Sequence, residues 1–177
     1  GILRDGVTTW LPTYIYESFG LSSEKSILTS AVIPIFSYIS LQICSKLYSK
    51  TGRKPFKCGL MVFAVGAAST IILVAFGGHS VILTAIMCAL IVGCMHGVNL
   101  VLISFIPGIY GNNENVSGLS GTLNFMTYVG SAASAYGFAL LSDSFGWNGT
   151  IISWVIIALL GTVTVGVCKI IDKEPQK

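Results

Sequence analysis

Long runs of apolar residues divide this chain into segments that are each about as long as a membrane-spanning helix. Between Lys25 and Lys46 lie 20 residues without Asp, Glu, Lys or Arg, and the later charge-free intervals contain 56, 28 and 25 residues. A helix needs about 20 predominantly apolar residues to cross the hydrocarbon core of a bilayer. The apolar runs are continuous and do not alternate with polar positions, so each interval predicts one spanning helix or a pair of them.

Turn-forming residues set the boundaries between these helices. Glycine, proline, asparagine and aspartate cluster at residues 77–80, 107–108, 111–113 and 143–146, and such clusters mark turns and loops. The pattern therefore predicts helices over residues 1–19, 23–48, 56–76, 81–106, 116–141 and 148–171. The first is short and carries three charges, so we interpret it as a truncated helix. The expectation is that residues 1–177 begin inside a longer chain.

The composition agrees with a membrane protein. Hydrophobic residues make up 53% of the chain and charged residues 10%, whereas soluble domains have roughly 45–50% and about 25%. The mean hydropathy is +0.80. These values exclude a soluble enzyme, a disordered tail and a nucleic-acid-binding protein, and they make the lipid bilayer the expected surroundings. The predicted fold class is an all-α membrane protein with six transmembrane helices.

The basic residues predict an orientation. Eight of the ten lie in a loop after the second helix and in the C-terminal tail, namely Lys46, Lys50, Arg53, Lys54, Lys57, Lys169, Lys173 and Lys177. With six helices these two regions lie on one side of the membrane, and the opposite loops hold only Lys25. Because Lys and Arg are enriched in cytoplasmic loops, we expect a C-terminus in the cytoplasm and a protein of the bacterial cytoplasmic membrane.

Arg4 is the basic residue that this orientation does not explain. If the first helix ends near Phe19, Arg4 lies about 22 Å deep, near or past the midplane of the bilayer. A charged group at that depth predicts a functional site, unless the helix begins elsewhere and Arg4 lies at the interface. Asp5 follows directly, but adjacent helical residues point about 100° apart, so the two need not pair. Asp5 is expected to face a neighbouring helix or a coupling path, or to be a structural partner for a polar group elsewhere.

Two later helices carry polar side chains at helical spacing. His96 and Asn99 share one face of the fourth helix, where they either line a polar cavity or form hydrogen bonds between helices. Gly93 and Gly97 form a GxxxG pair there, which permits close approach of another backbone. The fifth helix has a polar stripe that must face protein or water rather than lipid. Its members are Asn124, Thr127, Tyr128 and Ser131.

The remaining reactive residues predict no catalytic, metal or cofactor site. Five cysteines, Cys44, Cys58, Cys88, Cys94 and Cys168, lie in or beside apolar runs without CxxC spacing. We interpret them as packing residues. The chain has no triad order, HExxH motif, phosphate-binding loop or paired intramembrane carboxylates, so we do not expect an enzyme.

Several stretches resemble one transporter family. Residues 3–14, LRDGVTTWLPTY, are similar to the seventh helix of the organophosphate:phosphate antiporters of the major facilitator superfamily, where an Arg, a Gly two residues on and Trp-x-Pro-Thr-Tyr recur. Residues 45–54 resemble the superfamily loop motif G-x-x-x-D-x-x-G-R-R/K, with Ser45 and Ser49 in place of its Gly and Asp. Residues 121–130 and 145–149 resemble the eleventh helix and the turn before the twelfth.

The resemblance implies a fold and a set of binding residues. The chain would be the C-terminal half of the carrier, helices seven to twelve, built as two three-helix repeats, with the N-terminal half absent. Arg4 would bind the substrate phosphate and Tyr128 would line the same site. His96 stands where relatives have an aromatic pore-lining residue. Asp5 stands where members often have Tyr, which leaves the substrate open.

The expected function is therefore exchange of an organic phosphate, such as a sugar phosphate or glycerol 3-phosphate, for inorganic phosphate by alternating access. Candidate binding residues are Arg4, Tyr128, His96, Asn124 and Asn99, with Asp5 as a coupling residue. The alternatives are a carrier for another organic anion, proton-coupled through His96 or Asp5, and a transporter-like sensor of sugar phosphates. A membrane enzyme ranks last.

Overall fold

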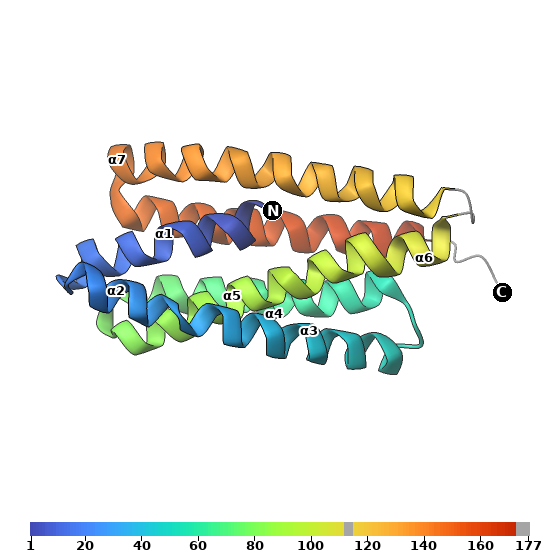
Figure 1. Cartoon of the computed structure of the whole chain (residues 1–177), viewed down its shortest axis with the longest axis horizontal. Coiled ribbons are helices and arrows are strands. Elements are labelled where there is room, and N and C mark those ends of the chain that lie inside the picture. The colour runs from blue at the N-terminus through green and yellow to red at the C-terminus, as the bar shows by residue number, and fades with distance from the viewer. Residues whose placement is uncertain (112–114, 173–177) are drawn as a thin grey trace.

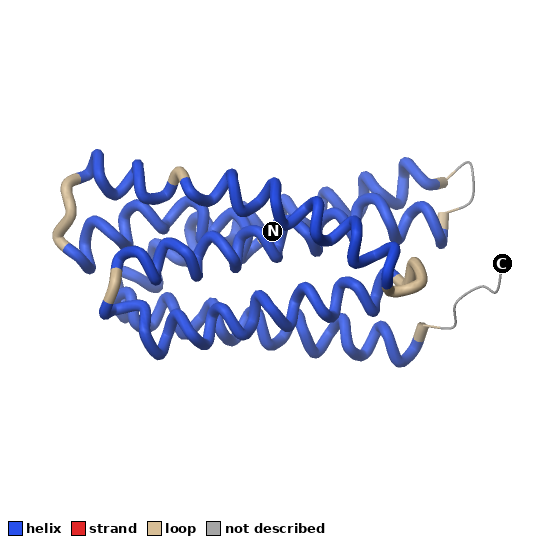
Figure 2. The backbone as a smooth tube through the Cα atoms, turned by 90° about the horizontal axis from the view of Figure 1, so that it is seen from below, coloured by secondary structure: helices blue, strands red, loops and turns tan. Residues whose placement is uncertain are grey.

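The computed structural model describes residues 1–111 and 115–172 as a bundle of helices, with no strand in either range. The helices run close to one common axis, and most connections gather at the two ends of the bundle (Figures 1 and 2). The predicted all-helical class is thereby confirmed. The predictions for Asn112, Asn113 and the tail at 173–177 lie outside the described residues.

The helix bounds follow the apolar runs closely. The first half of the chain forms α1 (Ile2–Phe19), α2 (Ser23–Ser30), α3 (Val32–Lys50) and α4 (Pro55–Phe76). The short turn η1 (Gly77–His79) then leads into α5 (Val81–Leu100), the π-helical turn η2 (Val101–Phe105) and α6 (Ile106–Tyr110). The last element is α7 (Val116–Ile171).

Four of the described segments are long and apolar enough to cross a membrane. They are Ser23–Lys50, Pro55–His79, Val81–Tyr110 and Val116–Ile171. Large apolar side chains cover the outside of the bundle, including Leu160 and Val163, which are 62% and 63% exposed. Such a surface suits lipid rather than water. The chain is thus consistent with a membrane protein, while the predicted number of six crossings and the transporter half-bundle stay predictions.

The 56-residue helix α7 folds back on itself. A straight helix of that length would measure about 84 Å, against a hydrocarbon core of about 30 Å. Gly146 has φ 67° and ψ −176°, values outside the helical region, and Figure 1 shows α7 reversing its direction at one end of the bundle. This reversal lies within the turn that the sequence predicts at residues 143–146.

Replacing Gly146 with alanine should destabilise the protein. An added Cβ would meet no atom within 4 Å, so the cost comes from the backbone conformation alone, which is nearly restricted to glycine and costs about 1–3 kcal/mol for other residues. The expected result is a lower unfolding temperature in detergent. Gly137→Ala is the matched control, because Gly137 also has free space but lies in regular helix. Equal unfolding temperatures for the two variants would contradict this explanation.

Prolines account for the two places where the helices differ from prediction. The predicted helix 23–48 is broken at Ala31, because Pro34 has no N–H to donate to the carbonyl of Ser30. The loop predicted at Pro107-Gly108 is wrong, since the chain stays helical to Tyr110. There the carbonyl of Ile103, four residues before Pro107, accepts a 2.6 Å hydrogen bond from the Ser120 hydroxyl instead.

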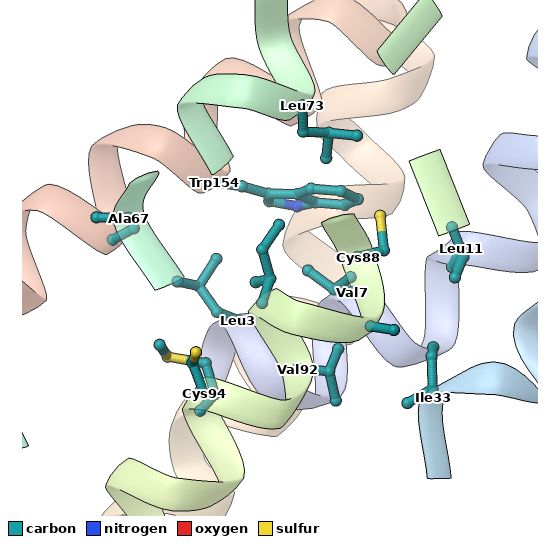
Figure 3. Close-up of a cluster of buried hydrophobic side chains, with 14 of the residues drawn as sticks. Leu3, Val7, Leu11, Ile33, Ala67, Leu73, Cys88, Val92, Cys94 and Trp154 are labelled. Atoms are coloured by element: carbon teal, nitrogen blue, oxygen red, sulfur yellow. The ribbon is translucent and has the colours of Figure 1, made fainter. Parts of the chain in front are cut away.

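The centre of the bundle is α5, against which α1, α3 and α4 pack. A Cβ on Gly97 would lie 3.3 Å from the Cβ of Cys44, so the GxxxG pair permits the close approach predicted from it. Figure 3 shows the Trp154 ring of α7 in the core beside Leu73 and Cys88. Four of the five cysteines are buried, as expected for packing residues, and Cys168 is half-buried.

Apart from Arg4 and Lys25, the described basic residues gather at one end of the bundle. The connection between α3 and α4 lies at the same end as the last turn of α7 (Figure 1), and Lys54, Lys57 and Lys169 line one small pocket there. Lys25 lies at the opposite end, in the first turn of α2, just after the connection from α1. The two ends of the bundle therefore differ in charge, while the membrane topology and the side of the membrane stay predictions.

Candidate functional site

Arg4 lies inside the bundle. The residue is 8% exposed, on α1, which packs between α5 and α7. The N-terminus lies about half-way along the bundle in Figure 1, and Arg4 follows it by one helical turn. A buried guanidinium thus lies near the middle of the bundle's length, and its depth in a membrane stays a prediction.

Small residues hold α1 tightly against α7 at this level. An added Cβ on Gly6 would overlap the ring of Phe138, and one on Gly130 would lie 3.0 Å from the Cγ1 of Ile2. Glycine on each helix therefore lets the two backbones approach closely, as small residues do between membrane helices. This contact places the first turn of α1 beside the polar stripe of α7.

Arg4 and Asp5 form a bidentate ion pair. The Arg4 Nε atom lies 2.5 Å from Asp5 Oδ1, and the Arg4 Nη2 atom donates to Asp5 Oδ2 over 2.7 Å. The two neighbours therefore do pair, a point that the helical angle alone left open. The 100° rotation between adjacent residues separates their Cβ atoms, but the long arginine side chain bends back across that angle and reaches the carboxylate.

Ser131 of α7 completes this arrangement. Its hydroxyl donates to Asp5 Oδ2 and also lies 3.0 Å from the carbonyl of Thr127. Asp5 thus joins α1 to α7 across 126 residues of sequence. The sequence places Ser131 in the polar stripe, but nothing in it singles out this residue as the partner of Asp5, because the contact depends on the register of the two helices.

Of the other predicted residues, Tyr128 contacts the ion pair. The Tyr128 ring centroid is 5.9 Å from Arg4 Cζ, within the range of a cation–π contact, and Tyr128 is 57% exposed. His96 is half-buried on α5, the helix that packs against α1. Side chains of α1 and α7 therefore contact the ion pair, and α5 packs beside it.

The two predicted asparagines are not joined to Arg4 by any contact among the described residues. Asn99 lies one turn beyond His96 on α5, and its side-chain oxygen is buried without a hydrogen-bond partner in the described part of the chain. Asn124 lies one turn before Tyr128 on α7 and is half-buried.

The chemistry of the site is that of an anion-binding cation with an internal counter-ion. A guanidinium has five N–H donors in one plane, and Asp5 accepts from two of them. A phosphate or carboxylate offers the same pair of oxygens, so an incoming anion would compete with Asp5 for these donors. A hydroxyl from Ser131 and the ring of Tyr128 would border the bound group.

No group of three or more His, Cys, Asp and Glu side chains in residues 1–111 and 115–172 is arranged to hold a metal ion. The family resemblance rests on the short stretches quoted above, and chiefly on residues 3–14. Across the whole chain, no protein-family model, curated protein or solved structure matches this sequence.

Proposed function

We propose that this chain is the C-terminal six-helix half of a major facilitator carrier that exchanges an organic phosphate for inorganic phosphate by alternating access. The observation that carries the proposal is the buried Arg4 guanidinium near the middle of the bundle. Polar and ionisable residues inside a membrane are costly and usually functional. Transporters commonly bind their substrates near the midplane, between two repeated halves.

The proposed site combines one cation with neutral polar groups. Arg4 would bind two phosphate oxygens at once, since its planar fork matches that geometry. Tyr128 and His96 would border the phosphate, while Asn124 and Asn99 would contact the organic part of the substrate. The other side of the site would come from the N-terminal half of the carrier. The basic end of the bundle and the C-terminus would face the cytoplasm.

The ion pair with Asp5 favours a second candidate, a proton-coupled carrier of another organic anion. A buried guanidinium without a partner is strongly unfavourable, which would force a carrier to exchange one anion for another. Asp5 supplies an internal anion when substrate is absent, so the empty carrier could return on its own. A proton on Asp5 would release Arg4 for the substrate and would move with it.

Transport by the full-length protein in proteoliposomes tests these candidates. Vesicles loaded with inorganic phosphate should take up external labelled glycerol 3-phosphate or hexose 6-phosphate, and uptake should stop when internal phosphate is omitted. The absence of counterflow with every organic phosphate tried would contradict the antiporter. Uptake driven by a pH gradient without internal phosphate would support the second candidate, and binding without any uptake would indicate a sensor.

A further inference from the structure

An apolar cleft lies between α3 and α4 on the outside of the bundle. The two helices make few contacts with each other, because both pack on α5. Residues of α5 form the floor of the cleft, and its volume is about 390 Å³. It is lined almost entirely by apolar atoms, from Ile39, Ile43 and Leu47 on α3, Met61 and Val65 on α4 and Leu90 on α5.

The cleft opens toward the surroundings of the bundle rather than toward its core. Ile39 and Ile43 on one wall are 47% and 60% exposed, and Met61 and Val65 on the other are 45% and 53% exposed. Both walls belong to segments long and apolar enough to cross a membrane. The chemistry that fits such an opening is a hydrocarbon chain entering sideways from the bilayer.

Cationic side chains lie beyond one end of this cleft. Lys46 and Lys50 follow the wall residues Ile39 and Ile43 by seven positions each, so they extend the same face of α3 by two helical turns. Both are exposed, and neither pairs with a carboxylate in the described part of the chain. From Lys46 to Lys57 the sequence holds five basic residues and no acidic one.

We infer that this cleft binds an anionic phospholipid, with one acyl chain between α3 and α4 and the headgroup phosphate at Lys46 and Lys50. Charge complementarity selects this occupant, because clusters of Lys and Arg at the end of a membrane helix attract acidic lipid headgroups. The long lysine side chains reach along apolar surface toward the interface while keeping their charge in water. The site lies on the outside of α3, apart from Arg4, and does not depend on the proposed transport function.

Native mass spectrometry of the full-length protein in detergent tests this site, with phosphatidylglycerol and phosphatidylcholine of identical chains as probes. Phosphatidylglycerol should form the more persistent adduct. Val65→Phe fills the cleft and should reduce that adduct to the level of phosphatidylcholine. Val74→Phe is the matched control, since Val74 is 47% exposed on the same helix but does not line the cleft; it should leave the adduct unchanged.

The headgroup contact has its own pair of variants. Lys50→Gln should weaken phosphatidylglycerol binding about fivefold, the effect of one basic residue near an acidic lipid surface. Lys25→Gln at the opposite end should have no effect. Elution volume and unfolding temperature check that each variant is folded.

Equal adducts with the two lipids, or equal effects of Val65→Phe and Val74→Phe, would overturn the inference. Weaker phosphatidylglycerol binding in Lys50→Gln together with unchanged binding in Val65→Phe would also overturn the inference. The headgroup phosphate would then bind the basic residues without an acyl chain in the cleft.

Discussion

Replacing Arg4 with lysine should lower the affinity for the transported anion by about 10- to 100-fold. Lysine keeps the positive charge but loses the planar fork, so at least one hydrogen bond between charged groups is lost, worth about 1.5–3 kcal/mol. The residue is buried and has its donors directed toward a carboxylate within the bundle, which leaves little room for water to replace the missing contact.

The measurement is the half-saturating concentration for uptake, or for binding of labelled substrate, in proteoliposomes of the full-length protein. Arg53→Lys provides the control, because it makes the same exchange at an exposed position in the connection between α3 and α4. It should leave the concentration dependence unchanged. An Arg4→Lys protein with the affinity of the unmodified protein would remove Arg4 from the binding site.

Replacing Asp5 with asparagine should have opposite effects on stability and on anion binding. The substitution leaves the buried Arg4 charge without its counter-ion. Breaking a fully buried pair costs roughly 3–5 kcal/mol, and we expect about 2 kcal/mol here because Asp5 is 34% exposed. The variant without substrate should therefore unfold at a lower temperature. Anions should bind it more tightly than the unmodified protein, since they no longer compete with the carboxylate.

Unfolding temperatures with and without inorganic phosphate check both effects, because a ligand that binds only the folded state stabilises it. Phosphate should raise the unfolding temperature more in Asp5→Asn than in the unmodified protein. Ser131→Ala serves as the control, since it removes one hydrogen bond from Asp5 but leaves the ion pair in place. An Asp5→Asn protein that is as stable as the unmodified one, with no larger response to phosphate, would contradict a counter-ion role.

The helix positions could be predicted from the sequence because apolar runs and turn residues are local signals. The reversal at Gly146 and the ends of α4 fall where the pattern places them. The exceptions arise at Pro34 and Pro107, because whether a helix breaks or continues at a proline depends on the groups around it. Pro34 interrupts its helix, whereas around Pro107 a π-helical turn and the Ser120 hydroxyl satisfy the backbone and the chain stays helical.

The candidate site could be predicted only in part. The burial of Arg4 follows from its depth in an apolar segment. The position of Tyr128 beside it is implied only by the family resemblance, because a polar stripe that faces protein or water does not specify its neighbour. The pairing with Asp5 could not be obtained from helical angles, because it depends on how a long side chain bends. The contribution of Ser131 depends on the tertiary contact between α1 and α7, which no local pattern in either helix encodes.

The ion pair also determines how a membrane voltage would act on the proposed carrier. Arg4 and Asp5 cancel each other's charge, so the empty site would carry no net charge across the electric field. The phosphate-loaded site would be negative, and each charge crossing the membrane is worth about 2.3 kcal/mol per 100 mV. The voltage would therefore oppose inward movement of a loaded carrier into a negative interior and favour the outward movement that exports phosphate. An empty return step, as in the second candidate, would be almost unaffected.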